Sequence, residues 1–200
     1  MNLADWAEDT ACAILRPTLP RRWAHSQGVA AQARGLAPIL GKDTDLVTAA
    51  AWLHDVGYAP DLTDTGFHPL DGARYLSDTR QASDMLCRLV AHHSGAMIEA
   101  AEYGLADQLA AEFEPAPADL SDALTYCDMV TGPDGQQLSV EQRLAEIRAR
   151  YGPDDPVSRA LAHSAPQLTG AVTRVRRKLA KSTSAPRMLS ALRRVLAATT

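Results

Sequence analysis

Apolar residues recur at spacings of three and four along most of the chain, and no segment alternates strictly between apolar and polar residues. The first pattern places side chains on one face of an α-helix, whereas a half-buried β-strand needs the second. We therefore expect an all-α fold, a helical bundle with further helices at its C-terminal end. The expected helices cover residues 3–15 and 20–40, a segment from Thr44 or Asp45 to about Gly57, a segment that opens at His68-Pro69, and then 83–93, 96–103, 105–113, 119–130, 139–150, 157–181 and 187–198.

The composition is that of an ordinary globular domain and excludes several classes of protein. With 200 residues, 46% of them hydrophobic and 22% charged, the chain is long enough for one domain with a proper core and too apolar for bulk disorder. No apolar run approaches the roughly 20 residues that cross a bilayer, and the N-terminal segment is acidic where a signal peptide is basic. Three scattered cysteines without a CxxC pair argue against disulfides and against a thiolate zinc site. We expect a soluble, cytoplasmic protein that does not enter a membrane.

The charge is divided unevenly along the chain. Residues 1–155 carry a net charge of −13, while residues 156–200 contain nine Lys or Arg and no acidic residue. We expect residues 1–155 to form the functional domain and residues 156–200 to form a basic helical extension that packs on it. Binding to nucleic acid is the alternative use of such a segment. It is disfavoured because no Phe, Trp or Tyr is interleaved with the basic residues from 156 onward.

Histidines and aspartates fall on the apolar faces of the expected helices. His25 shares a face with Val29 and Ala33, and His54 shares one with Ala50. The same helical phase turns three further polar side chains inward: His92, His93 and Asp128. A single inward histidine is usually a core residue with a hydrogen-bond partner. Several of them together with carboxylates are better explained by a shared metal centre.

The donor atoms narrow the choice of metal. Imidazole and carboxylate ligands without thiolates suit Fe, Mn, Co, Ni, Zn or Mg. His54 and Asp55 are adjacent, about 100° apart on a helix, so both meet one ion only where a helix ends, and Gly57 supplies that end. Asp55 has two oxygens, which allows it to bridge two ions. A pair of ions about 3.5–4 Å apart can bind a phosphate and activate the water between them.

These residues resemble the HD-domain superfamily of metal-dependent phosphohydrolases, and in particular its HDIG-type branch. The H…HD…D pattern is carried by His25 in RRWAHSQGVA, by His54-Asp55 in AAWLHDVGY and by Asp128 in LTYCDMVTG. The segments FHPLDGA (67–73) and VAHHSG (90–95) are similar to two further motifs of that branch, and the match covers about residues 20–135. The resemblance implies that a first metal is held by His25, His54, Asp55 and Asp128. It implies that Asp55 bridges to a second metal, which is also held by His68, His92 and His93.

The chain departs from the family pattern in two places. Many relatives read HDIGK, whereas this chain reads HDVGY, so Tyr58 replaces a lysine that would offer a positive charge to a phosphate. The GYP sequence of the cyclic-dinucleotide phosphodiesterases is missing after HHSG. A cyclic dinucleotide is therefore a less favoured substrate.

Further residues near these motifs are candidates for substrate contact. Arg22 lies three residues before His25 and shares its face, so we assign Arg22, with His54 and Asp55, to the catalytic group. Weaker candidates, for phosphate binding, proton transfer or substrate orientation, are Arg21, Asp61, Ser94 and Thr131.

The leading hypothesis is an enzyme that hydrolyses a phosphate ester of a small, nucleotide-like substrate. Metal-activated hydroxide would attack phosphorus, and the two ions would stabilise the charge on the phosphoryl oxygens. Monoester and diester substrates both stay open, as do the identity of the metal and the oligomeric state. Two other hypotheses are a regulatory or ligand-binding module that keeps the metal site, and a nucleic-acid-interacting protein that uses the basic extension.

Overall fold

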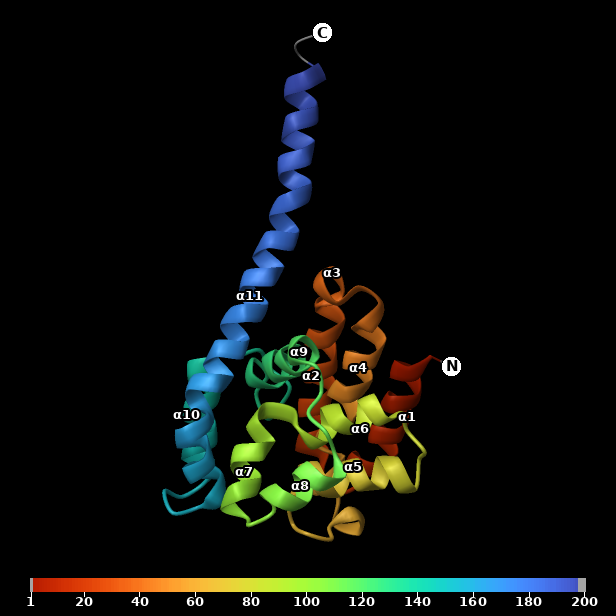
Figure 1. Cartoon of the computed structure of the whole chain (residues 1–200), viewed down its shortest axis with the longest axis vertical. Coiled ribbons are helices and arrows are strands. Elements are labelled where there is room, and N and C mark those ends of the chain that lie inside the picture. The colour runs from red at the N-terminus through yellow and green to blue at the C-terminus, as the bar shows by residue number, and fades with distance from the viewer. Residues whose placement is uncertain (1, 198–200) are drawn as a thin grey trace.

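The computed structural model describes residues 2–197, and their side chains as far as Thr183. This part of the chain folds into helices and connecting loops, with no β-strand among its residues, as the sequence predicts (Figure 1). The first half contains α1 (Leu3–Leu15), α2 (Pro20–Gly35), α3 (Ala37–Leu40), α4 (Thr44–Leu53), α5 (His68–Asp78) and α6 (Asp84–Ala91). The second half contains α7 (Ala96–Glu102), α8 (Ala106–Glu112), α9 (Ala118–Met129), α10 (Val140–Arg150) and α11 (Pro156–Ala197). Short 3₁₀ turns lie at η1 (Gly41–Asp43), η2 (Val56–Tyr58), η3 (Pro60–Leu62) and η4 (His93–Gly95).

The prediction of one helix over residues 20–40 is wrong, because the chain breaks between α2 and α3. Leu36, at the break, has φ −86° and ψ 1°, outside the α-helical range. Pro38 follows in the first turn of α3 and has no N–H to donate to the preceding helix, so the hydrogen-bond ladder stops there.

The helix expected at residues 83–93 also ends early. Its N-cap is Ser83, but α6 stops at Ala91 and the turn η4 follows. Within that turn, Ser94 has φ 49° and Gly95 has φ 81°. A positive φ is uncommon for a residue other than glycine. The chain therefore changes direction directly after the paired histidines, which matters for the site described below.

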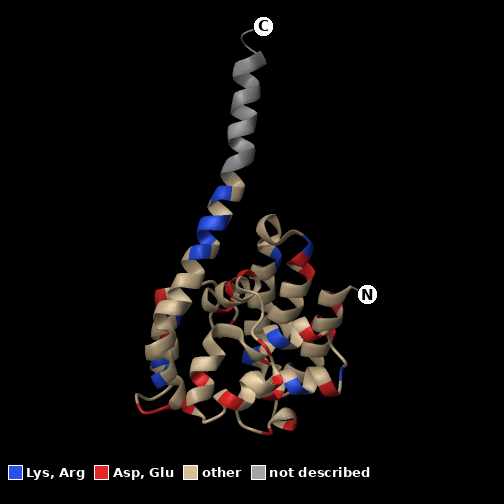
Figure 2. Cartoon of the chain, in the orientation of Figure 1, with Lys and Arg blue, Asp and Glu red and all other residues tan. Residues whose placement is uncertain are grey.

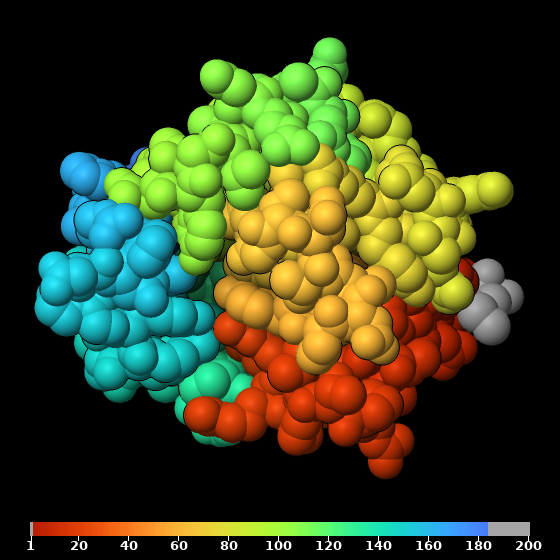
Figure 3. Space-filling model, turned by 90° about the horizontal axis from the view of Figure 1, so that it is seen from below, coloured from red at the N-terminus to blue at the C-terminus, as the bar shows by residue number. Residues whose placement is uncertain are grey.

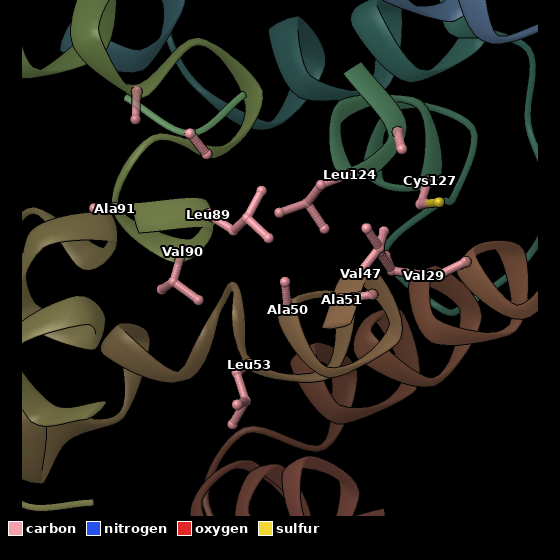
Figure 4. Packing of buried hydrophobic residues seen from close by; sticks show 14 of the residues in the cluster. Val29, Val47, Ala50, Ala51, Leu53, Leu89, Val90, Ala91, Leu124 and Cys127 are labelled. Atoms are coloured by element: carbon pink, nitrogen blue, oxygen red, sulfur yellow. The ribbon is translucent and has the colours of Figure 1, made fainter. Parts of the chain in front are cut away.

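The core lies where α4 meets other helices. α4 packs against α1, α2, α6 and α9. Residues 47–53 are all buried, and the three alanines at 49–51 let neighbouring helices approach closely. Side chains of α4 meet Val29 of α2, Leu89 of α6 and Leu124 of α9 (Figure 4). The C-terminal end of α4 is therefore held firmly inside the molecule.

The C-terminal helix α11 packs along α7, α9 and α10 and then passes α3 (Figure 1). Val172 and Val175 on its inner face are buried. α11 is continuous where the sequence predicts two helices, at 157–181 and 187–198. The last three residues of the chain lie outside the described residues, as do the side chains from residue 184 onward.

Basic side chains of α11 pair with acidic side chains of α9. Arg174 Nε lies 2.6 Å from Asp122 Oδ2, and Lys178 Nζ lies 2.6 Å from Asp119 Oδ1. Figure 2 shows the basic run along this part of α11. Exposed pairs of this kind contribute little to stability, so burial of the apolar face does most to attach the helix. The division of the chain at residue 155 stays a prediction.

Two further expectations concern cysteines and membranes. All three cysteines are free thiols, and Cys87 and Cys127 are buried. Among the described helices, none is both long and apolar enough to span a bilayer.

Candidate metal centre

Six of the seven residues that the family resemblance assigns to metals meet in one place. They come from α2, from the segment directly after α4, from the start of α5, from η4 and from α9. All six are buried: His25, His54, Asp55, His68, His93 and Asp128. The packing of helices around α4 thus joins segments that are far apart in the sequence.

The six residues form two groups. In each group the nitrogen and oxygen atoms that could bind a metal lie within 4.8 Å of one another. Asp55 belongs to one group and also adjoins the other, because its Oδ1 is 3.5 Å from Nε2 of both His54 and His68. Its Oδ2 lies 3.9 Å from Nε2 of His25. One group consists of His25, His54 and Asp128, and the other of Asp55, His68 and His93.

Backbone carbonyls fix the orientation of three of the imidazoles. Nδ1 of His54 and Nδ1 of His93 each lie close to the carbonyl oxygen three residues earlier, at 2.8 and 2.6 Å. Nδ1 of His25 lies 3.0 Å from the carbonyl oxygen of Gly132. A carbonyl oxygen can only accept a hydrogen bond, so each Nδ1 carries the hydrogen and each Nε2 presents a lone pair. This arrangement is typical of histidines that bind a metal.

Some of the nitrogen atoms in this cluster lack a hydrogen-bond partner that satisfies them. Nε2 of His54 is buried and has no hydrogen-bond partner among the described residues. Nε2 of His68 and Nε2 of His93 face each other at 3.2 Å. Buried polar atoms are normally satisfied, and a divalent cation would satisfy these. The residues present therefore fit a metal.

Four of the six residues have pKa values shifted toward the charge state that a cation needs. Burial alone would raise the pKa of Asp55, but the guanidinium of Arg22 and the neighbouring imidazoles hold that pKa well below its usual range. Burial opposes ionisation of Asp128 as well, yet a histidine hydrogen bond and a nearby arginine hold its pKa low. Burial lowers the pKa of His68 and His93. At neutral pH the carboxylates are ionised and these two imidazoles are neutral.

A close contact between two backbone segments brings His68 to Asp55. A β-carbon on Gly57 would lie 2.0 Å from the carbonyl oxygen of His68 and 2.6 Å from the backbone nitrogen of Gly72. Only glycine fits at such an approach. The loop before α5 is held by buried Asp71, whose carboxylate accepts backbone N–H groups of residues 64, 65 and 66 at 3.2, 2.9 and 3.1 Å.

Arg22 is held against the cluster by two contacts. Its Nη1 donates to Asp55 Oδ2 at 2.7 Å. Its guanidinium carbon lies 3.7 Å from the centre of the Tyr58 ring, and that ring stacks on His68 at a centroid distance of 3.8 Å. Tyr58, at the position where many HDIG-type relatives have a lysine, therefore supports an arginine beside the cluster.

The structure does not bring His92 to the cluster. Its Nε2 donates to the carbonyl oxygen of Phe113 at 2.6 Å and so carries a hydrogen directed away from the site. The physical reason is the end of α6 at Ala91, because helical phase no longer applies to the two histidines that follow. His93, one residue later, turns inward.

The weaker candidates lie in different surroundings. Ser94 Oγ donates to Asp128 Oδ2 at 2.5 Å and so orients that carboxylate. Thr131 donates to the carbonyl oxygen of Cys127 and supports the end of α9. Asp61 is exposed, and Arg21 pairs with a surface aspartate.

A cavity opens beside the cluster, and its space of about 660 Å³ is partly open to solvent. Figure 3 shows the hollow where the cyan segment near residue 151, the green segment near residue 99 and the orange segment near residue 58 meet. Part of the lining is charged and is formed by the cluster with Arg22, Arg143 and Arg150. Another part is apolar and is formed by α10, by the residue after it and by α11, with Ile147, Tyr151, Leu161 and Leu168.

Sequence reasoning missed two charged residues of this cavity. Arg143 is buried, and its Nη2 lies 3.4 Å from Asp128 Oδ1. It shares the apolar face of α10 with Val140 and Ile147, the same signal that marked the histidines. Glu99 lines the cavity, and burial together with the charge of Asp55 raises its pKa to about 7. Such a carboxyl can both give and take a proton near neutral pH.

Comparison with known proteins identifies the family. The family model described as "HD domain" matches residues 22–151, well over half of the chain. No curated protein and no solved structure gives a significant match. HD domains bind divalent metals, and the family consists generally of metal-dependent hydrolases. The matched segment contains all six residues of the cluster as well as Arg22 and Arg143. The chain therefore belongs to the HD domain family.

Proposed function

We propose that this protein is a metal-dependent phosphohydrolase that cleaves a phosphate ester of a small, nucleotide-like substrate. The observation that carries the proposal is the orientation of three imidazoles. Backbone carbonyls fix their Nδ1 atoms, so their Nε2 atoms converge with two carboxylates. Such a set of donors does not stabilise a packed core, whereas it is a typical ligand set for divalent cations.

The proposed centre holds two ions per chain. Asp55 is within reach of donors in both groups and is the natural shared ligand. When bound, the ions would stabilise the charge on phosphoryl oxygens and lower the pKa of a water molecule. The remaining ligands would be His25, His54 and Asp128 for one ion and His68 and His93 for the other.

Arg22 is proposed to bind the phosphate group. One of its N–H groups holds Asp55, and the residue also lines the cavity. A guanidinium has five N–H donors, so others are free to reach phosphoryl oxygens in the geometry that Arg favours. Stacking on Tyr58 restricts the guanidinium to this position.

The apolar part of the cavity lining supports an organic substrate rather than free phosphate. Tyr151 contributes an aromatic ring, which also contacts Arg150, and Ile147, Leu161 and Leu168 contribute aliphatic surface to the same cavity. A base or another flat ring would bury apolar area there while its phosphate stays near Arg22. This combination is what a nucleotide-like molecule presents.

The test is a metal count joined to an activity screen. Full-length protein purified anaerobically should contain close to two transition-metal ions per chain. With added Mn or Co it should release phosphate from members of a panel of nucleotide monoesters and diesters. Asp55→Asn should lose metal and lower turnover by about 100-fold or more, because the shared carboxylate is gone. A metal-loaded protein that cleaves no ester would contradict the proposal and favour a ligand-binding module.

A further inference from the structure

We infer that the substrate carries a second phosphate group, and that an arginine-lined cavity beside the metal centre binds it. This inference rests on the proposed function. The second cavity encloses about 420 Å³, part of it open to solvent. We call it the arginine cavity, and it is lined by Arg21, Arg22, His25, Pro133, Arg143 and Arg150.

The charges of this cavity favour an anion. Four of its six lining residues are arginines, and no acidic residue lines it. Each arginine has an acidic partner, and all of these partners lie outside the lining: Asp134 pairs with Arg21, Asp55 with Arg22, Asp128 and Glu146 with Arg143, and Glu146 also with Arg150. Several guanidinium groups around one opening are the arrangement that binds phosphate oxygens.

One donor in the cavity wall has no acceptor. Arg143 is 4% exposed, and its Nε is buried without a hydrogen-bond partner among the described residues. Leaving a buried charged group short of a hydrogen bond is costly. Its Nη atoms already contact Asp128 and Glu146, so an acceptor for Nε has to come from elsewhere. Arg143 lines the arginine cavity, so we infer that a bound anion, with a small shift of this side chain, supplies that acceptor.

The arginine cavity adjoins the cavity in which we propose that the substrate binds. Arg22, Arg143 and Arg150 line both cavities, and Arg22 also contacts Asp55 of the metal cluster. His25 lines the arginine cavity and belongs to the metal group. One molecule can therefore place one phosphate at the metals and a linked phosphate among the arginines. The substrate class is a small molecule with two or more linked phosphate groups.

The test measures binding of phosphate chains to full-length, Mn-loaded protein by calorimetry. The probes are orthophosphate, pyrophosphate and tripolyphosphate. Arg21→Gln combined with Arg150→Gln should weaken binding of the two linked probes at least about tenfold and should weaken orthophosphate less than about twofold. The matched control is Arg148→Gln on the same helix, because Arg148 is exposed and lines neither cavity.

Two outcomes would overturn the inference: equal weakening of all three probes in the double variant, or the same loss with Arg148→Gln. Hydrolysis of the panel of nucleotide monoesters and diesters is measured in the same preparations. No hydrolysis of any member would contradict the proposed function, while the binding ratio decides the arginine cavity independently.

Discussion

His92 and His93 are neighbours in the chain, but their imidazoles lie in different surroundings. Nε2 of His93 faces His68 inside the cluster, whereas Nε2 of His92 donates to a backbone carbonyl. We expect His93→Gln to lower the metal content from two ions toward one and to reduce turnover about 100-fold. His92→Gln can keep the hydrogen bond to the carbonyl and should retain both ions. Metal analysis and turnover of the two variants check this, and equal losses in both would contradict the assignment.

Glu99 makes the stability of the metal-free protein depend on pH. Burial and the charge of Asp55 raise its pKa from 4.5 to about 7, with Asp155 and Asp128 adding to the rise and Arg22 opposing it. Between these values the folded state holds a proton that the unfolded state has released. Stability from this group is therefore present at low pH and is lost as the pH rises through about 7.

The variant Glu99→Gln removes that dependence. Relative to the natural protein, it should gain stability between pH 5 and pH 8, by up to about 3 kcal/mol. Urea unfolding of both proteins in the presence of a chelator, at the two pH values, measures the difference. A stability difference that is the same at both pH values would show that Glu99 does not titrate in this window.

Helical phase predicted site residues well only inside helices. His25 and Asp128 lie within α2 and α9, and both point inward as their spacing indicates. The phase is undefined beyond the end of α6, so it could not separate the paired histidines. Arg143 carried the same signal on α10, but an arginine on a helix is usually solvated. Only its buried contact with Asp128 reveals its place.

At the scale of elements, the site depends on how closely η2 and α5 approach. Gly57→Ala should push α5 away, because the added β-carbon would lie 2.0 Å from a backbone carbonyl oxygen. We expect a loss of about 1–3 kcal/mol in stability, and weaker binding of the ion that His68 helps to hold. Gly35→Ala is the control, since no atom lies within 4 Å of the added carbon. Thermal unfolding and metal counts compare the two, and similar melting temperatures would contradict the role of this contact.

The sequence predicted most elements and missed some of their boundaries. Apolar spacing and caps such as Ser83 place α4, α6 and α9 within a few residues. The break at Leu36 and the continuity of α11 were missed. A periodic pattern is insensitive to the local hydrogen bonding that decides whether a helix breaks or continues.

At the scale of the whole molecule, the lining of the cavity extends beyond the residues that match the family. The matched segment ends at residue 151, yet α11 supplies Leu161, Ser164 and Leu168 to the cavity wall. The residues of the cluster thus all lie inside the matched segment, whereas part of the apolar wall lies beyond it. Changes in α11 can alter which substrate fits without touching a ligand, so its attachment to the body should affect substrate binding more than metal content.

That attachment can be weakened without removing any charge. Val172 and Val175 are buried against the body, so replacing both with alanine should cost roughly 3 kcal/mol and lower the melting temperature by roughly 6–12 °C. KM should rise while the metal content stays near two, because no ligand lies on α11. Thr173→Ala, at an exposed position between them, is the control.

Salt at 0.5 M should change the melting temperature little, since the ion pairs to Asp119 and Asp122 are exposed. An unchanged melting temperature, together with DNA or RNA binding that is lost when the basic residues of α11 are replaced, would instead favour a nucleic-acid partner for this helix.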